Sequence, residues 1–363
     1  MVKQSAAKSY VLLALTILII IVAVSRLPNP SAEPKVLEED FEFQEEQAAF
    51  AGKAAEIAYP QYEKELSLAS GLTFSYLSSY ELDKKDESIT RLVIVIHGVT
   101  RNAEGYFQAI APVVVKENTV LIAPHFLTAE DPLKQKQLHW TSSGWKRGDK
   151  STEEYSFRYS SFEILDTLIT TVLRKLPKVN EIIVVGHSAG GQFVHRYAAG
   201  NQKEGSLRGV KMKYVVVNPS SYLYLNDKRW DEKSHSFTAP LTTTGILLDI
   251  RNILACPDYD EYAKGLQNLN AYMRSVGEQR LQKNLVNRKV VYLLGSADTG
   301  EAQLDTSCAA MLQGKDRFER GNIFVEHLNT FFPKNNALKI IVSGVGHNSA
   351  KMFQSAEGRR VLG

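Results

Sequence analysis

Short apolar runs alternate with amphipathic stretches from about residue 66 to the end of the chain. Runs such as 91–96 (RLVIVI) are continuous and rich in β-branched residues, which is typical of strands buried on both faces of a parallel sheet. The stretches between them carry apolar residues at helical spacing. We therefore predict an α/β fold with a mostly parallel central sheet and helices on both faces. The expected strands are 72–77, 91–96, 119–123, 181–185, 213–217, 289–294 and 338–342, and the expected helices are 102–115, 162–176, 188–199, 259–275 and 318–332.

The N-terminus has the pattern of a targeting segment. Lys3 and Lys8 give it a positive start, and residues 10–24 are uncharged and almost wholly apolar. Ala23 and Ser25 are small residues where a signal peptidase would cleave. The apolar run falls between a signal-peptide core and a full membrane span of about 20 residues. Residues 1–25 are thus expected to be a signal peptide or an N-terminal membrane anchor, which exports the chain to the periplasm or beyond.

Three parts follow from these patterns. After residues 1–25, a linker is expected over 26–65, with three prolines and an acidic, helix-prone stretch at 38–46. The α/β domain would then span 66–363. Its longest insertion between strands is expected at about 218–288.

Composition and cysteine content change this picture little. The formal charge of the 363 residues is only +3, and no basic run interleaved with aromatics predicts a nucleic-acid partner. Cys256 and Cys308 have no spacing typical of a zinc site, so no metal is expected. In an oxidising compartment the two cysteines could form a disulfide.

One glycine-rich segment carries candidate chemistry. The strand 181–185 (EIIVV) leads directly into Gly186-His187-Ser188-Ala189-Gly190-Gly191, and a helix follows. This is a G-x-S-x-G motif in a strand–turn–helix context. A sharp turn there would lift the Ser188 hydroxyl clear of the sheet, and Gly186 and Gly190 would relieve crowding. The alternative is an ordinary βα turn with Ser188 as a helix N-cap.

With this motif in place, residues 66–360 resemble the α/β-hydrolase superfamily of the serine esterase and lipase type. The resemblance implies a chain order of nucleophile, acid and histidine, and it makes 218–288 a cap-like insertion. His347 lies between two glycines in the loop after the last strand, as the family histidine does. Asp298 follows the penultimate strand in a G-x-x-D pattern and matches the family acid. Asp305 and, more weakly, Asp249 are alternative acids.

The resemblance also implies an oxyanion hole and a substrate pocket. Ala189 and Val99 would each supply a backbone N–H, although the loop His97-Gly98-Val99 lacks the HGGG form of the motif. Trp140, Trp145 and Tyr222 are candidate substrate-binding aromatics. The basic residues of 125–155 could favour acidic or sugar substrates, or form a solvated loop face: Lys134, Lys136, Lys146, Arg147 and Lys150. A Cys256–Cys308 bridge would tie the cap to the acid's loop.

We therefore expect a serine hydrolase that acts on a small-molecule carboxylic ester or acylated substrate. Ser188, Asp298 and His347 would be its catalytic residues, and the mechanism requires no metal or organic cofactor. Amide or peptide hydrolysis, or acyl transfer, by the same residues stays open. So does a non-catalytic, membrane-tethered binding module that keeps the fold. The sequence leaves the oligomeric state undetermined.

Overall fold

The computed structural model describes residues 59–152, 156–240 and 256–363. The chain divides into two units, Met1–Glu45 and Glu46–Gly363, and all described residues belong to the second. The expected targeting segment, the acidic stretch and Asp249 lie outside the described residues. Within the described ranges, no helix combines the length and apolar character needed to cross a membrane.

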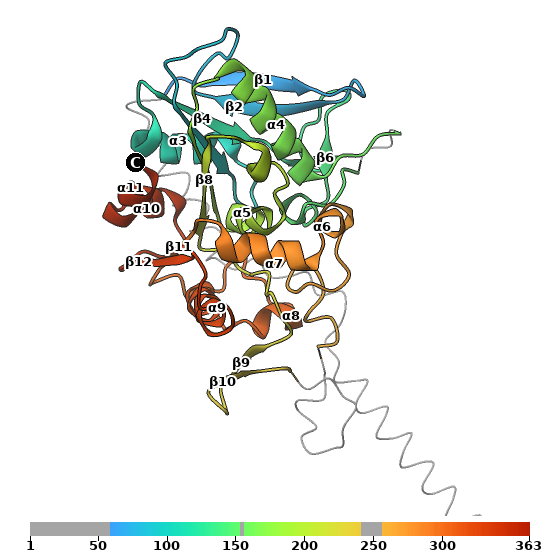
Figure 1. Cartoon of the computed structure of the whole chain (residues 1–363), viewed down its shortest axis with the longest axis vertical. Helices are drawn as coiled ribbons and strands as arrows, with labels where there is room; N and C mark the ends of the chain where they lie inside the picture. The colour runs from blue at the N-terminus through green and yellow to red at the C-terminus, as the bar shows by residue number, and fades with distance from the viewer. Residues whose placement is uncertain (1–58, 153–155, 241–255) are drawn as a thin grey trace, which may run out of the picture. The chain divides into compact units, whose positions relative to one another are not determined.

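A single eight-stranded sheet runs through the described unit (Figure 1). Its strand order is β1-β2-β4-β3-β7-β8-β11-β12. β1 and β2 pair antiparallel, β2 joins β4 antiparallel, and all the remaining pairs are parallel. The strands are β1 (Tyr62–Ser67), β2 (Thr73–Ser78), β3 (Arg91–Ile96), β4 (Thr119–Pro124), β7 (Glu181–His187), β8 (Lys211–Val217), β11 (Val290–Gly295) and β12 (Leu338–Val342).

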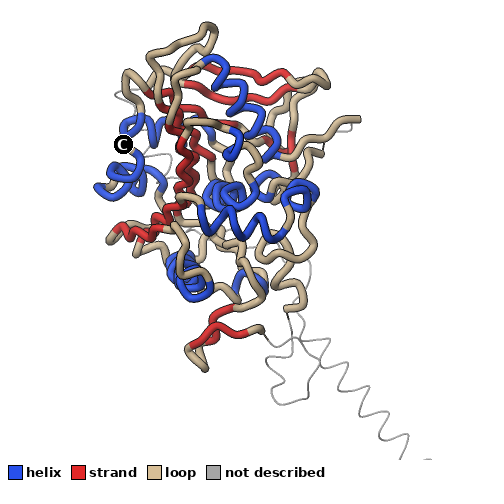
Figure 2. The backbone as a smooth tube through the Cα atoms, in the orientation of Figure 1, coloured by secondary structure: helices blue, strands red, loops and turns tan. Residues whose placement is uncertain are grey.

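Alternating side chains of the central strands fill two apolar cores, one on each face of the sheet. In β3, Leu92, Ile94 and Ile96 belong to one core, whereas Val93 and Val95 belong to the other. Helices α4, α5, α6, α7 and α9 cover the first core, and α3, α10 and α11 cover the second (Figures 1 and 2). The helices are α3 (Ala103–Val114), α4 (Ser161–Lys175), α5 (Ala189–Gly200), α6 (Ala271–Val276), α7 (Glu278–Asn287), α8 (Cys308–Met311), α9 (Arg317–Phe331), α10 (Ser349–Gln354) and α11 (Ala356–Leu362).

This architecture confirms the predicted fold class, and each expected strand is present. One strand of the eight-stranded sheet was missed: β1 begins at Tyr62, inside the segment expected to be a linker. Only Leu66 of β1 is buried, so its apolar pattern is too weak to indicate a strand.

The helix expected at 259–275 is wrong over most of its length. Turns occupy the segment up to Asn268, and α6 begins only at Ala271. Gly265 packs against the Asp260 carbonyl too closely for any side chain, and Asn268 has a φ of 50°. These contacts bend the backbone away from a helix, and the Asn270 side chain then caps α6 by accepting from the Met273 N–H.

The described residues between β8 and β11, 218–240 and 256–289, form small elements. A hairpin of β9 and β10 comes first, and α6 and α7 return the chain to β11. The remaining short elements of the described residues are β5 (Leu127–Thr128), β6 (His139–Trp140), η1 (Trp145–Arg147), η2 (Glu204–Ser206), β9 (Arg229–Asp231) and β10 (Ser236–Thr238).

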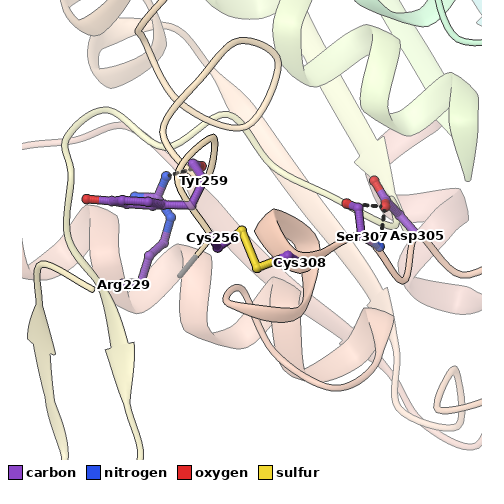
Figure 3. Close-up of a disulfide and its surroundings, with 6 residues drawn as sticks. All are labelled: Arg229, Cys256, Tyr259, Asp305, Ser307 and Cys308. Atoms are coloured by element: carbon purple, nitrogen blue, oxygen red, sulfur yellow. Dashed lines mark hydrogen bonds between the residues drawn. A yellow bond between two sulfur atoms is a disulfide. The ribbon is translucent and has the colours of Figure 1, made fainter. Parts of the chain in front are cut away.

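A disulfide joins Cys256 to Cys308, the pairing that the sequence left open (Figure 3). Their Cα atoms lie 5.7 Å apart across a separation of 52 residues. Closing a loop of that length stabilises the folded state by about 4 kcal/mol in the chain-entropy model. Since Cys308 begins α8, the bridge fastens the segment before α6 to the loop that follows β11.

Candidate active site

The turn between β7 and α5 holds Ser188 in a strained backbone conformation. Its φ of 58° and ψ of −121° lie in a region that residues with side chains rarely occupy. A Cβ at Gly186 would collide with the Gly190 carbonyl, and one at Gly190 would collide with the carbonyls of Ile96 and His97. The two glycines therefore allow the end of β7, the start of α5 and the end of β3 to meet in backbone contact.

Ser188, His347 and Asp298 form a continuous hydrogen-bonded chain. The Ser188 Oγ lies 3.0 Å from His347 Nε2, and His347 Nδ1 lies 2.7 Å from Asp298 Oδ2. Ser188 follows β7, Asp298 follows β11, and His347 lies between β12 and α10. The structure thus brings together the three residues that the sequence placed at the carboxyl ends of separate strands.

A buried cation lies behind the carboxylate of this chain. Arg317 Nη1 is 3.6 Å from Asp298 Oδ1, and both side chains are only 1% exposed. Asp298 Oδ1 has no hydrogen-bond partner among the described residues, while Arg317 donates to the carbonyls of Gly300 and Ala302. Burial raises the pKa of Asp298, and Arg317 and His187 oppose that rise. Arg317, at the start of α9, therefore helps keep the carboxylate ionised.

Two further side chains support the imidazole of His347. The ring centroids of His187 and His347 are 4.4 Å apart, and His187 Nδ1 lies 3.1 Å from the Tyr106 hydroxyl. That hydroxyl also fills the space beside Gly98, where a side chain would collide with it. Burial lowers the pKa of His347 well below its ordinary value, and Arg317 acts in the same direction. His347 is therefore neutral near pH 7, as a general base must be.

The loops that carry Asp298 and His347 are fastened to each other and to β8. The Ala297 N–H donates to the Val345 carbonyl, and the Gly344 N–H donates to the Ser296 hydroxyl. Asn218, directly after β8, accepts from the Gly295 N–H and donates to the Gly346 carbonyl. A change in one loop would thus displace the other.

The segment after β3 has the features of the expected oxyanion loop. His97 is fully buried, and its Nε2 accepts from the Phe126 N–H while Nδ1 lies 2.9 Å from the Gly98 carbonyl. Burial lowers the pKa of His97 to about 3, so the ring is neutral and braces the turn. Among the described residues, the N–H groups of Val99 and Ala189 donate to no protein acceptor. Both groups are therefore free to bind developing negative charge.

The three aromatics expected to line a substrate pocket are instead buried in the core. Trp140, Trp145 and Tyr222 are 1%, 0% and 0% exposed. Trp140 donates to the Asp149 and Tyr159 carbonyls, and Tyr222 packs against the ring of Phe324. The ring of Trp145 lies 4.7 Å from that of His97, so it supports the oxyanion loop from behind. Their contribution is packing rather than an exposed wall.

Other candidate residues are engaged elsewhere. Asp305, the alternative acid, forms an ion pair with Lys264 at 3.0 Å and accepts from Ser307. His195 lies in the middle of α5, where its Nε2 accepts from the Leu223 N–H. In the part of the chain that the structure describes, no group of three or more His, Cys, Asp or Glu side chains is placed to hold a metal ion.

Sequence reasoning missed four residues of this site: His187, Tyr106, Arg317 and Asn218. Only His187 carried a local signal, since it adjoins Ser188 in the G-x-S-x-G motif. Chemically, the arrangement can transfer the Ser188 proton to His347 and place a nucleophilic oxygen beside two free N–H donors.

No protein-family model matches the sequence, and no curated protein matches it either. Among solved structures, poly(aspartic acid) hydrolase-1 from Sphingomonas sp. KT-1 aligns with a TM-score of 0.57 and 21% identity, covering 84% of this chain and 99% of its own. LpqC, a poly(3-hydroxybutyrate) depolymerase from Bordetella parapertussis, aligns with a TM-score of 0.56 and 18% identity, covering 84% and 92%. The chain therefore has the α/β-hydrolase fold, as the resemblance implied.

The backbone contacts of the turn around Ser188 predict how adding a methyl group at Gly186 changes stability. Gly186→Ala should lower the free energy of unfolding by about 2–4 kcal/mol, because the new Cβ meets the Gly190 backbone, which has no room to move. Urea denaturation measures this. Gly205→Ala is the control, since nothing lies within 4 Å of its Cβ position. Equal stability of the two variants would contradict the constraint.

Proposed function

We propose that this protein is a serine hydrolase that cleaves carboxylic esters through an acyl-serine intermediate. The hydrogen-bonded chain from Ser188 through His347 to Asp298, at 3.0 and 2.7 Å, carries this proposal. The strained turn supports it, because such a backbone conformation persists where it presents a reactive group. The names of the two structural neighbours, a hydrolase and a depolymerase, are consistent with it.

In the proposed acylation, Ser188 Oγ attacks the ester carbonyl carbon while His347 Nε2 takes the hydroxyl proton. The N–H groups of Ala189 and Val99 bind the oxyanion of the tetrahedral intermediate. His347 then returns the proton to the departing alkoxide, and the alcohol leaves. Asp298 holds the imidazole orientation and stabilises its cation throughout.

Deacylation uses the same groups with water in place of the alcohol. His347 takes a proton from water, the resulting hydroxide attacks the acyl carbon, and the proton returns to Ser188 as the acid is released. A small ester or acylated molecule is the substrate class that this chemistry serves.

A fluorophosphonate probe tests the nucleophile directly. Wild-type protein should be labelled at Ser188, and Ser188→Ala should lose both the label and about 10³-fold or more of the turnover of p-nitrophenyl acetate. Ser160→Ala is a matched control, since this serine is also buried but caps α4. Folded wild-type protein that neither labels nor turns over any ester would refute the proposal and favour a binding module.

We expect Arg317, the cation beside Asp298, to influence how hydrolysis varies with pH. Arg317→Met removes a positive charge that lowers the pKa of Asp298 and that of His347. Both pKa values should therefore rise in the variant. On acidification, the variant should lose activity at a higher pH than the wild-type protein does. A shift of about one unit in the acid limb of kcat/KM is expected. Because the pair titrates together, the limb belongs to both groups.

Two controls separate this effect from a structural defect of Arg317→Met. Arg317→Lys keeps the positive charge, so the acid limb of its kcat/KM profile should lie close to that of the wild-type protein. Lys315→Met removes a cation that is 76% exposed, only two residues away, and should leave the limb in place. An unchanged acid limb in folded Arg317→Met would show that the cation does not act on the pair.

We also propose that residues 1–25 direct export, as a cleaved signal or a retained anchor. The positive start and apolar run support this, and so does a disulfide that needs an oxidising compartment. Fractionation of cells expressing the full chain should place it outside the cytoplasm, and N-terminal sequencing should then decide between cleavage and retention. Recovery of intact chain with reduced cysteines from the cytoplasm would contradict export.

A further inference from the structure

A buried guanidinium without a carboxylate partner lies on the helix that follows the nucleophile. Arg196 of α5 is only 2% exposed, and among the described residues it forms no ion pair. Its partners are neutral: the Ala263 and Lys146 carbonyls, Gln192 Oε1 and Ser221 Oγ. No described carboxylate contacts this guanidinium directly, and Asp305 and Asp149 act on it only from a distance. A positive field therefore remains beside it.

Lys146 adds a second uncompensated cation at the same place. Its side chain is half-buried, and within the described ranges it has neither an acidic partner nor a hydrogen-bond acceptor. Burial, together with Arg196 and Arg147, lowers the pKa of Lys146 to about 8, and Asp305 opposes them. Asp305 is already paired with Lys264. The local field at Lys146 is therefore positive, and a solvated loop face does not describe this lysine.

The cavity lined by Arg147 and Lys264 does not have an excess of positive charge. It has a volume of about 540 Å³, and Arg147 and Lys264 line it together with two acids, Asp258 and Glu261. Its wall carries both signs of charge. The excess positive charge thus lies with Lys146 and Arg196, on the side of α5.

A chain of hydrogen bonds and ring contacts connects that position to the segments around Ser188. Gln192 and Arg196 follow the nucleophile by four and eight residues on α5, so Arg196 lies about 12 Å along the helix. Gln192 bonds to Ser220 and Ser221 after β8, and Arg196 holds the Lys146 carbonyl. The residue before Lys146, Trp145, packs on His97 of the oxyanion loop. Lys146 is therefore fastened both to the helix of the nucleophile and to the loop of Val99.

We propose that Lys146 is a specificity residue that binds an anionic group on the ester substrate, in the positive field of Arg196. This inference rests on the proposed ester hydrolase function and names its substrate class: esters that carry a carboxylate or similar anion several bonds from the reacting carbonyl. The ammonium donates charge-assisted hydrogen bonds to that anion. Arg196 is a positioning residue, since each of its three guanidinium nitrogens already donates to a protein oxygen.

Paired substrates of equal length test the preference for charge. For the acyl side, the mono-p-nitrophenyl ester of suberic acid is compared with p-nitrophenyl octanoate. For the alcohol side, 4-(4-carboxybutyl)phenyl acetate is compared with 4-pentylphenyl acetate. In at least one pair, wild-type protein should prefer the charged ester in kcat/KM by about tenfold, the effect of one charge-assisted contact. Salt should weaken the preference.

Lys146→Met keeps the length of the side chain and removes its charge. The ratio of charged to neutral kcat/KM should fall about tenfold toward one, chiefly through a higher KM for the charged ester. The ratio is measured on one preparation, so partial loss of folded enzyme does not alter it. Lys150→Gln is the matched control, because this lysine lies on the same segment and is exposed. It should keep the wild-type ratio.

The outcomes separate the two proposals. If wild-type protein cleaves the neutral esters but shows no charge preference in either pair, this inference is overturned and the hydrolase function stands. A preference that persists in Lys146→Met also overturns it. If the folded protein cleaves no ester and takes no fluorophosphonate label, the hydrolase function itself fails.

Discussion

The close approach of three backbone segments is the constraint on which the rest of the site depends. Gly186 lies against the Gly190 carbonyl, and Gly190 lies against the carbonyls that end β3. This contact forces Ser188 into its unusual conformation and sets the start of α5 beside the loop of Val99. One packing requirement therefore fixes the position of the hydroxyl and of both free N–H groups. The Ser188 hydroxyl and the two N–H groups are therefore positioned by the same rigid backbone contact.

Buried arginines hold the loops around that origin. Arg317 binds the carbonyls of Gly300 and Ala302 beyond Asp298, and Arg320 binds those of Ser220, Asp305 and Gly314. Arg196 does the same between α5, Lys146 and Ala263. A guanidinium can donate five hydrogen bonds in one plane, so a single side chain can fasten several irregular segments. One of these cross-links also places positive charge beside Asp298, where Arg317 lowers the pKa of the carboxyl.

Much of this arrangement could be predicted from local sequence, and the reasons are physical. Strands such as β3 and β7 are buried on both faces, so their apolar runs are continuous and easy to recognise. The G-x-S-x-G motif and the loops after β11 and β12 gave Ser188, Asp298 and His347, which the structure brings into contact. Roles that depend on packing between distant segments were not predictable. Arg317 meets Asp298 from the start of α9, and Trp140 and Tyr222 turned inward because apolar neighbours surround them.

The bridge between Cys256 and Cys308 has a consequence for redesign of this protein. The insertion between β8 and β11 is bounded at both ends by strands of the sheet, so it could be exchanged for another without altering the register of those strands. Cys308, however, belongs to the segment beyond β11. A graft that omits Cys256 would leave an unpaired thiol near the acid loop, available for mixed disulfides and dimerisation. Chimeras of this protein therefore need either a matching cysteine in the graft or a second substitution outside it.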